Sequence, residues 1–180
     1  MTSTMSVAYR TPAPRMMSIF SRNAMGPQYA ALRSGTTFAS AAWPSANRTF
    51  YYPFTLLDYE TVYKFWWANG AATGTNNLQM AIYRDTYERL ILGTSTLAAG
   101  NTQVQEDDIT DVGLPPGRYY LGIGCNGTTA TVIRGAPSNT SAEASGAYGQ
   151  ATAFTLPDPM VPVRISSLSD SFVLCGVRFR

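Results

Sequence analysis

The chain has 180 residues, of which 45% are apolar and 13% charged, and its formal net charge is +2. This composition is typical of a globular chain with one core and excludes a disordered one. The absence of histidine excludes the serine–histidine and cysteine–histidine nucleophile pairs and the usual zinc sites, so we expect no enzyme.

The sequence also argues against a membrane protein. No apolar run is long enough to span a bilayer. The first ten residues, MTSTMSVAYR, lack the basic and then apolar layout of a secretory signal. We therefore expect a protein that is made and used without membrane export and has no membrane partner.

The N-terminal part of the chain is basic. Residues 1–57 carry five arginines and no acid, whereas residues 58–180 carry eight basic and eleven acidic residues. Residues 1–42 show little periodicity, so we predict an extended basic arm over 1–42 and a body over 43–180. Such an arm could dock on an acidic partner surface or be a solvated tail. Its arginines are too widely spaced to favour nucleic acid as a partner.

The body consists of short segments with strand periodicity. Residues 102–109 are polar, which predicts a strand at a sheet edge, and residues 171–179 are apolar on both faces, which predicts a central strand. Residues 137–150 are rich in Ser, Ala and Gly and predict a long surface loop. The remaining predicted strands are 47–54, 59–68, 78–84, 89–94, 119–125, 129–134 and 161–165.

The stretch Leu114–Ile133 carries the strongest local signal. Apolar residues alternate up to Cys125, and Asn126-Gly127 then suits the positive φ angles of a type I′ turn. This predicts a hairpin between strands 119–125 and 129–134. Many short strands with turns between them indicate an all-β, antiparallel β-sandwich, and the long end loops favour a jelly roll over an immunoglobulin-like topology.

Few residues suggest chemistry. The acidic run Glu106–Asp108 with Asp111 could bind calcium, but it lacks the glycine and spacing of a calcium loop, and strand alternation would place adjacent carboxylates on opposite faces. We favour a solvated edge and predict no catalytic, cofactor or metal site. Cys125 and Cys175 read as small buried apolar residues, with a disulfide between them as the alternative.

Aromatic residues offer a second type of site. Trp43 or Trp66, if exposed, could stack on the face of a sugar ring, as in carbohydrate-binding sandwiches. The alternative is that these rings belong to the core or to a subunit interface.

Three stretches resemble a group of tailed-bacteriophage virion proteins. They are AWPSANRTFYYPF (Ala42–Phe54), LQMAIYRDTYERLI (Leu78–Ile91) and DITDVGLPPGRYYLGIGCNGTTATV (Asp108–Val132). These motifs mark strand ends and turns, so they specify a fold family better than a role. The sequence departs from the usual pattern at residues 85–88, where a glycine-containing turn is common, and at Gly122, where alanine is frequent.

The resemblance implies a structural virion component, assembled in the bacterial cytoplasm, without catalytic residues or cofactors. It implies a head decoration (cement) protein or a tail or fibre appendage, used as a homo-oligomer and most plausibly a homotrimer. In the first case the partner is the major capsid protein or another virion protein, and the arm docks through Arg10, Arg15, Arg22 and Arg33. In the second case the sandwich binds a host surface glycan.

Overall fold

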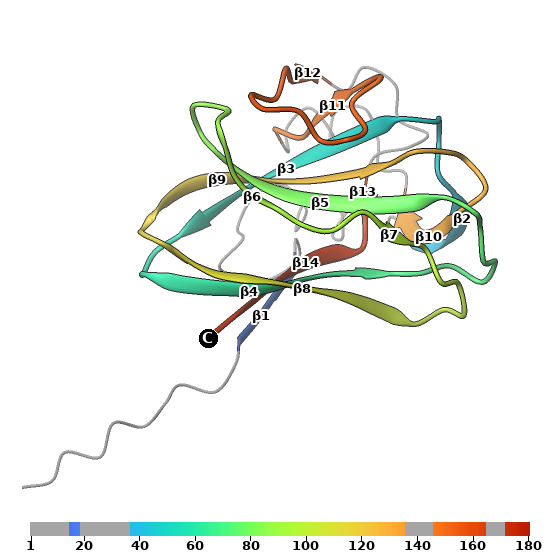
Figure 1. The fold of residues 1–180 in the computed structure, drawn as a ribbon, viewed down its shortest axis with the longest axis horizontal. Coiled ribbons are helices and arrows are strands. Elements are labelled where there is room, and N and C mark those ends of the chain that lie inside the picture. Colours follow the sequence, from blue (N-terminus) through green and yellow to red (C-terminus); the bar gives the residue numbers. More distant parts are fainter. Residues whose placement is uncertain (1–14, 19–36, 136–145, 165–171) are drawn as a thin grey trace, which may run out of the picture.

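The computed structural model describes residues 15–18 (backbone only), 37–135, 146–164 and 172–180. Throughout these residues the regular structure is β, in antiparallel sheets packed together, which confirms the predicted all-β sandwich (Figure 1). The strands are β1 Arg15–Ser18, β2 Ala39–Ala42, β3 Arg48–Leu56, β4 Glu60–Ala68, β5 Asn77–Arg84, β6 Arg89–Leu92, β7 Thr96–Leu97, β8 Val104–Leu114, β9 Gly117–Cys125, β10 Thr131–Gly135, β11 Tyr148–Gln150, β12 Val163–Arg164, β13 Phe172–Val173 and β14 Cys175–Phe179.

Two sheets form the main layers. The four-stranded sheet has the order β1-β14-β4-β8, and the larger sheet has the order β12-β11-β3-β9-β5-β6, with β7 also paired to β5. Strand β8 lies at an edge, which confirms the prediction for the polar strand. The predicted central strand over 171–179 is confirmed only for its second part, β14, because residues 172–173 form β13 at the edge of another sheet. Strand β11 pairs with β3 only along Thr49–Tyr51. Pro53 of β3 lies beyond these pairs, so its missing N–H costs no hydrogen bond with β11.

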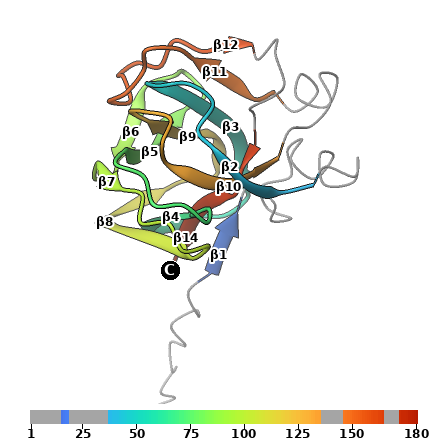
Figure 2. The same cartoon turned by 90° about the vertical axis from the view of Figure 1, so that its right-hand side faces the viewer.

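A third, smaller sheet closes one flank of the sandwich. Its order is β13-β10-β2, and Figure 2 shows β2 and β10 between the two larger sheets. Strand β13 leads into β14 at Leu174, whose amide donates to Ile133 and whose carbonyl accepts from Ala68, both at 2.8 Å. The chain thus changes sheets at a bend, as at the corners of other sandwiches.

Two strands lie within residues 1–42, the segment predicted as the arm. Strand β2 lies before residue 43, yet all four of its residues pair with β10. Strand β1 also lies within the predicted arm and pairs with β14. The sequence of β2 shows no strand periodicity, because Ala39, Ser40 and Ala41 differ little in polarity.

The predicted hairpin at Asn126-Gly127 is wrong. Strand β9 pairs with β3 and β5, whereas β10 pairs with β2 and β13. The Asn126 side chain accepts a hydrogen bond from the Asn77 amide (2.9 Å), and a side chain on Gly127 would collide with Asn76. Contacts with the β4–β5 loop therefore hold these residues in an open connection that carries the chain to another sheet.

The core lies between the main sheets, and a second layer covers the outer face of the larger sheet. Residues 151–162, which connect β11 to β12 and which we call the cover segment, pack there on an aromatic cluster. The Tyr83 hydroxyl donates to the Pro157 carbonyl (3.0 Å), and Met160 donates to the Tyr87 carbonyl (3.0 Å). The buried members of this cluster are Tyr51, Ala81, Tyr83, Tyr120, Leu156 and Met160. Burial raises the pKa of both Tyr51 and Tyr83.

Candidate functional sites

The N-terminal strand forms one edge of the four-stranded sheet. Strand β1 pairs with β14 over four residues, from Arg15 opposite Phe179 to Ser18 opposite Gly176. The next strand of the chain, β2, belongs to a different sheet. Among the described residues, the N-terminal part of the chain is thus joined to the four-stranded sheet through β1 and to the small sheet through β2.

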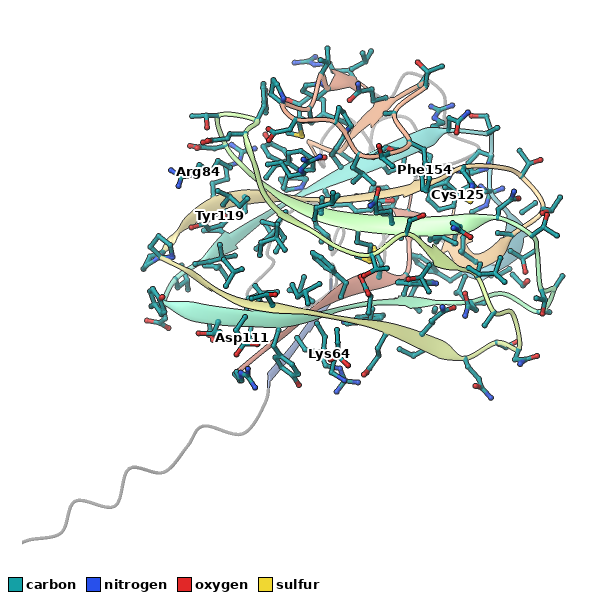
Figure 3. The ribbon with its side chains drawn as sticks, in the orientation of Figure 1. Lys64, Arg84, Asp111, Tyr119, Cys125 and Phe154 are labelled. Carbon is teal, nitrogen blue, oxygen red and sulfur yellow. The ribbon has the colours of Figure 1, made fainter. Side chains whose placement is uncertain are left out.

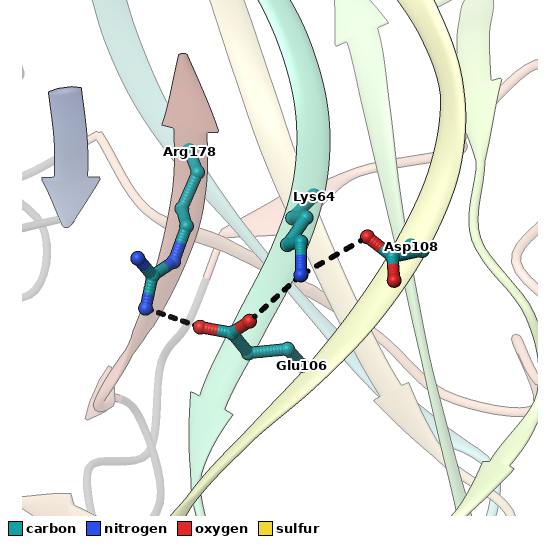
Figure 4. A network of polar contacts seen from close by, with 4 residues as sticks. All are labelled: Lys64, Glu106, Asp108 and Arg178. Carbon is teal, nitrogen blue, oxygen red and sulfur yellow. Dashed lines mark hydrogen bonds and ion pairs between the residues drawn. The ribbon is translucent and has the colours of Figure 1, made fainter. Parts of the chain in front are cut away.

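A charged network lies on the four-stranded sheet (Figure 4). Lys64 on β4 contacts both Glu106 and Asp108 on β8 at 3.1 Å, and Arg178 on β14 pairs with Glu106. The hydrogen bonds that Lys64 donates to Glu106 and Asp108 raise the pKa of Lys64. The network links three strands and leaves little net charge on this face.

The acidic run does not gather as a metal site. Glu106 and Asp108 pair with Lys64, while Asp107 is buried and accepts a hydrogen bond from the Thr94 amide at 2.7 Å. This is the split between faces that strand alternation predicts. Among the described residues, no three His, Cys, Asp or Glu side chains are grouped to hold a metal ion.

The four arginines proposed for docking are not brought together in the described part of the chain. Arg10, Arg22 and Arg33 lie outside the described residues. Arg15 is the first residue of β1, at the edge of the sheet. The docking role of this set therefore stays a prediction.

Neither tryptophan proposed for glycan stacking is accessible. Trp43 is 1% exposed, and its Nε1–H donates to the Arg48 carbonyl at 3.0 Å. Trp66, opposite Glu106 and Gly176 in the sheet, is 5% exposed. Sugar stacking needs an open ring face, so the alternative assignment of these rings to buried structure is correct for the single chain.

The two cysteines lie on different sheets. Cys125 ends β9 and Cys175 begins β14, and both are free and buried. Burial raises the pKa of each thiol. The interpretation of both as small buried apolar residues is confirmed, and the disulfide alternative is wrong.

The residues that carry the phage resemblance act in turns. Asn47 adopts a φ of 57° in the corner between Trp43 and Arg48, where the Arg48 amide donates to Ser45. In the loop between β8 and β9, the Tyr119 hydroxyl donates to the Pro115 carbonyl at 2.7 Å. Both motifs fix strand ends, as the sequence predicts.

Sequence reasoning missed a cavity at one end of the sandwich. It has a volume of about 370 Å³ and lies between the β5–β6 turn of one sheet and the end of β8 in the other. Figure 3 labels Arg84 and Tyr119, which lie on its wall. The lining residues are Arg84, Asp85, Leu90, Val112, Gly113, Leu114, Pro115, Pro116, Gly117, Arg118 and Tyr119. Three separate segments of the chain line the cavity, so no local sequence motif predicts it.

Comparison with known proteins gives no assignment. The chain matches no family model, no curated protein and no solved structure. The described residues also contain no helix that is long and apolar enough to cross a membrane.

Proposed function

We propose that the chain is a structural component of a tailed-phage virion, namely a head decoration protein whose N-terminal segment docks on the capsid. The motif resemblance over roughly residues 42–134 supports this assignment to a phage family. Those motif residues hold turns and strand ends, which fits a role in architecture rather than in catalysis.

The position of β1 is the observation that carries the docking proposal. It joins the sandwich through one four-residue ladder, while β2 joins a different sheet. An N-terminal segment attached at a sheet edge can extend to a neighbour without disturbing the core, because strand edges present unpaired backbone groups.

The strand order also favours the predicted jelly roll. Eight strands, counted in chain order, are β1, β3, β4, β5, β6, β8, β9 and β14. On this count one sheet takes the first, eighth, third and sixth, and the other takes the second, seventh, fourth and fifth. This is the interleaved order that two Greek keys produce. Copies of such a body, as a homotrimer, would then stand on the particle surface.

The test is the location of the protein in purified particles of the phage that encodes it. We expect mass spectrometry to find the chain in the particle and cryo-electron microscopy to place it on the head. Copies found only on the tail or fibres would favour the alternative, an appendage that binds a host glycan. Absence from the particle would contradict both.

The docking role needs a separate comparison. A variant without residues 1–36 keeps β2 and is expected to lose binding to particles that lack the protein, whereas the full chain co-sediments with them. Circular dichroism would check that the truncated body is folded. Equal co-sedimentation of both forms would contradict docking through the N-terminal segment.

A further inference from the structure

We propose that the cavity between Arg84 and Tyr119 is a binding site for a neutral saccharide of one or two rings. This proposal does not depend on the virion role. It also differs from the sequence-based hypothesis, since it uses neither Trp43 nor Trp66 and involves other loops.

The inner wall of the cavity is apolar and rigid. The Tyr119 ring stacks on Phe54 with centroids 5.6 Å apart, and its hydroxyl is held by the Pro115 carbonyl at 2.7 Å. Pro115 and Pro116 form the adjoining wall, and proline rings fix the backbone there. The surrounding aliphatic side chains are Leu90, Val112 and Leu114. A wall that is already ordered loses little entropy when a ligand binds.

The polar groups at the rim come from one turn. Arg84 ends β5 and Asp85 follows it, and both are exposed. Arg84 has only a loose ion pair with Glu88, at 3.6 Å and more than half exposed on both sides, so its donors can turn to a ligand. The Tyr119 hydroxyl uses its proton on Pro115 and keeps lone pairs that can accept a hydrogen bond.

The charge balance favours a neutral ligand. Arg84 and Arg118 line the cavity, and they are offset by Asp85 in the lining and by Glu88, which pairs with Arg84. An anion would meet the Asp85 carboxylate, and a cation would meet Arg84 and Arg118. Sugar hydroxyls both donate and accept, so they can use Asp85 and Arg84 together.

The size and the mixed lining agree with this class of ligand. A volume of about 370 Å³ is at the small end of ordinary ligand pockets, which run from about 300 to 1,000 Å³. A pyranose has apolar C–H groups for the accessible Pro115, Pro116 and Leu90 side of the cavity, behind which Tyr119 is buried, and it has hydroxyls around its rim. A longer apolar ligand would gain nothing from Arg84 and Asp85, which lie exposed at the rim.

The experiment is a titration of the ¹⁵N-labelled full chain, followed by NMR. The probes are glucose, galactose, mannose, N-acetylglucosamine, rhamnose, maltose and cellobiose, each to about 50 mM, with acetate and ethylammonium as charged probes. We expect at least one sugar to shift the amides of Gly113, Gly117 and Tyr119 with a Kd in the millimolar range, about −4 kcal/mol or weaker. The charged probes should leave them unchanged.

Substitutions locate the site. Arg84→Ala and Asp85→Asn should each weaken that sugar at least about fivefold, because each removes a hydrogen-bonding charge. The control is Arg164→Ala, an exposed arginine on β12, which should leave the Kd unchanged. The same spectra show whether each variant is folded.

Three results would overturn the proposal. The first is that no sugar shifts the three amides. The second is that acetate or ethylammonium shifts them as strongly as any sugar does. The third is that folded Arg84→Ala and Asp85→Asn proteins bind the sugar as tightly as the unaltered chain.

Discussion

Leu156 of the cover segment occupies the space that Gly122 leaves open on β9. A Cβ atom at Gly122 would lie 2.9 Å from Leu156 Cδ2, 3.0 Å from the Tyr83 ring and 3.1 Å from the Tyr51 ring. All three side chains are buried. One missing methyl group therefore lets the cover segment lie against the larger sheet.

This contact predicts that Gly122→Ala destabilises the protein. Overpacking a buried contact costs about 1–3 kcal/mol, and urea unfolding would measure the loss. Gly117→Ala on the same strand is the control, because its Cβ would meet only ordinary contacts at 3.5 Å or more. Equal stability of the two variants would mean that the cover segment does not rest on Gly122.

A second prediction concerns Tyr87, which adopts a φ of 77° in the β5–β6 turn. This is the turn in which the sequence departs from the glycine-containing phage pattern. The Tyr87 ring lies 5.9 Å from Tyr120 and its carbonyl accepts from Met160, so contacts with the aromatic cluster hold the unfavourable backbone. Tyr87→Gly and Tyr87→Ala both remove the ring, but only glycine suits the positive φ. We expect the glycine variant to be more stable by about 1 kcal/mol. Greater stability of the alanine variant in thermal unfolding would contradict this account.

The third prediction concerns Asn76, whose Oδ1 accepts hydrogen bonds from the amides of Thr129 (2.7 Å) and Ala130 (3.3 Å) and from the Thr129 hydroxyl (2.7 Å). Asn76→Ala leaves these donors without their partner and should cost about 1–3 kcal/mol. Asn76→Asp keeps an acceptor and should lose less. Thr128, an exposed residue next to Thr129 in the β9–β10 connection, provides a control, since Thr128→Ala should be nearly neutral in chemical denaturation.

The fourth prediction is a loss of stability in alkali. Burial raises the pKa of the Cys175 thiol and of the Tyr51 and Tyr83 phenols, whereas the same groups in the unfolded chain titrate near about 8.5 and 10. Above those values the unfolded chain releases protons that the native chain keeps, so the free energy of unfolding falls as pH rises. Each group contributes up to about 1.4 kcal/mol per pH unit.

Denaturation between pH 7 and pH 11 would measure this slope. Absorbance at 295 nm, which reports phenolate, should rise for these buried tyrosines together with unfolding rather than before it. Cys175→Ala should flatten the slope between about pH 8.5 and 10, even if the cavity that it creates lowers stability overall. A slope that this variant leaves unchanged would show that the thiol does not contribute.

The sequence predicted the features that depend on the pattern of apolar and polar residues within a single strand. The strand over residues 78–84 was clear because Leu78, Met80 and Ile82 share a face, and all three are buried. The edge position of β8 followed from its polar residues, and the interior position of β14 from apolar residues on both faces. Each of these predictions depends on side chains within one strand.

The features that the sequence did not predict depend on contacts between residues that are distant in sequence. Asn126-Gly127 fits a tight turn by itself, but hydrogen bonds with Asn77 and the close approach of Asn76 hold it open. The end cavity depends on the approach of Arg84 to the β8–β9 loop. Trp66 was a candidate for ligand binding because alternation predicts on which face of the sheet a ring lies. Alternation does not predict whether other residues cover that face.

The placement of β14 between β1 and β4 has a consequence for synthesis of the chain. Strand β4 emerges from the ribosome long before β14, so one side of β4 keeps unpaired backbone groups while more than a hundred residues are added. Pairings between early and late strands also make folding slow. Nascent chains on neighbouring ribosomes carry the same unpaired edge, and cotranslational aggregation, rather than the stability of the finished sandwich, should therefore limit the yield of this protein.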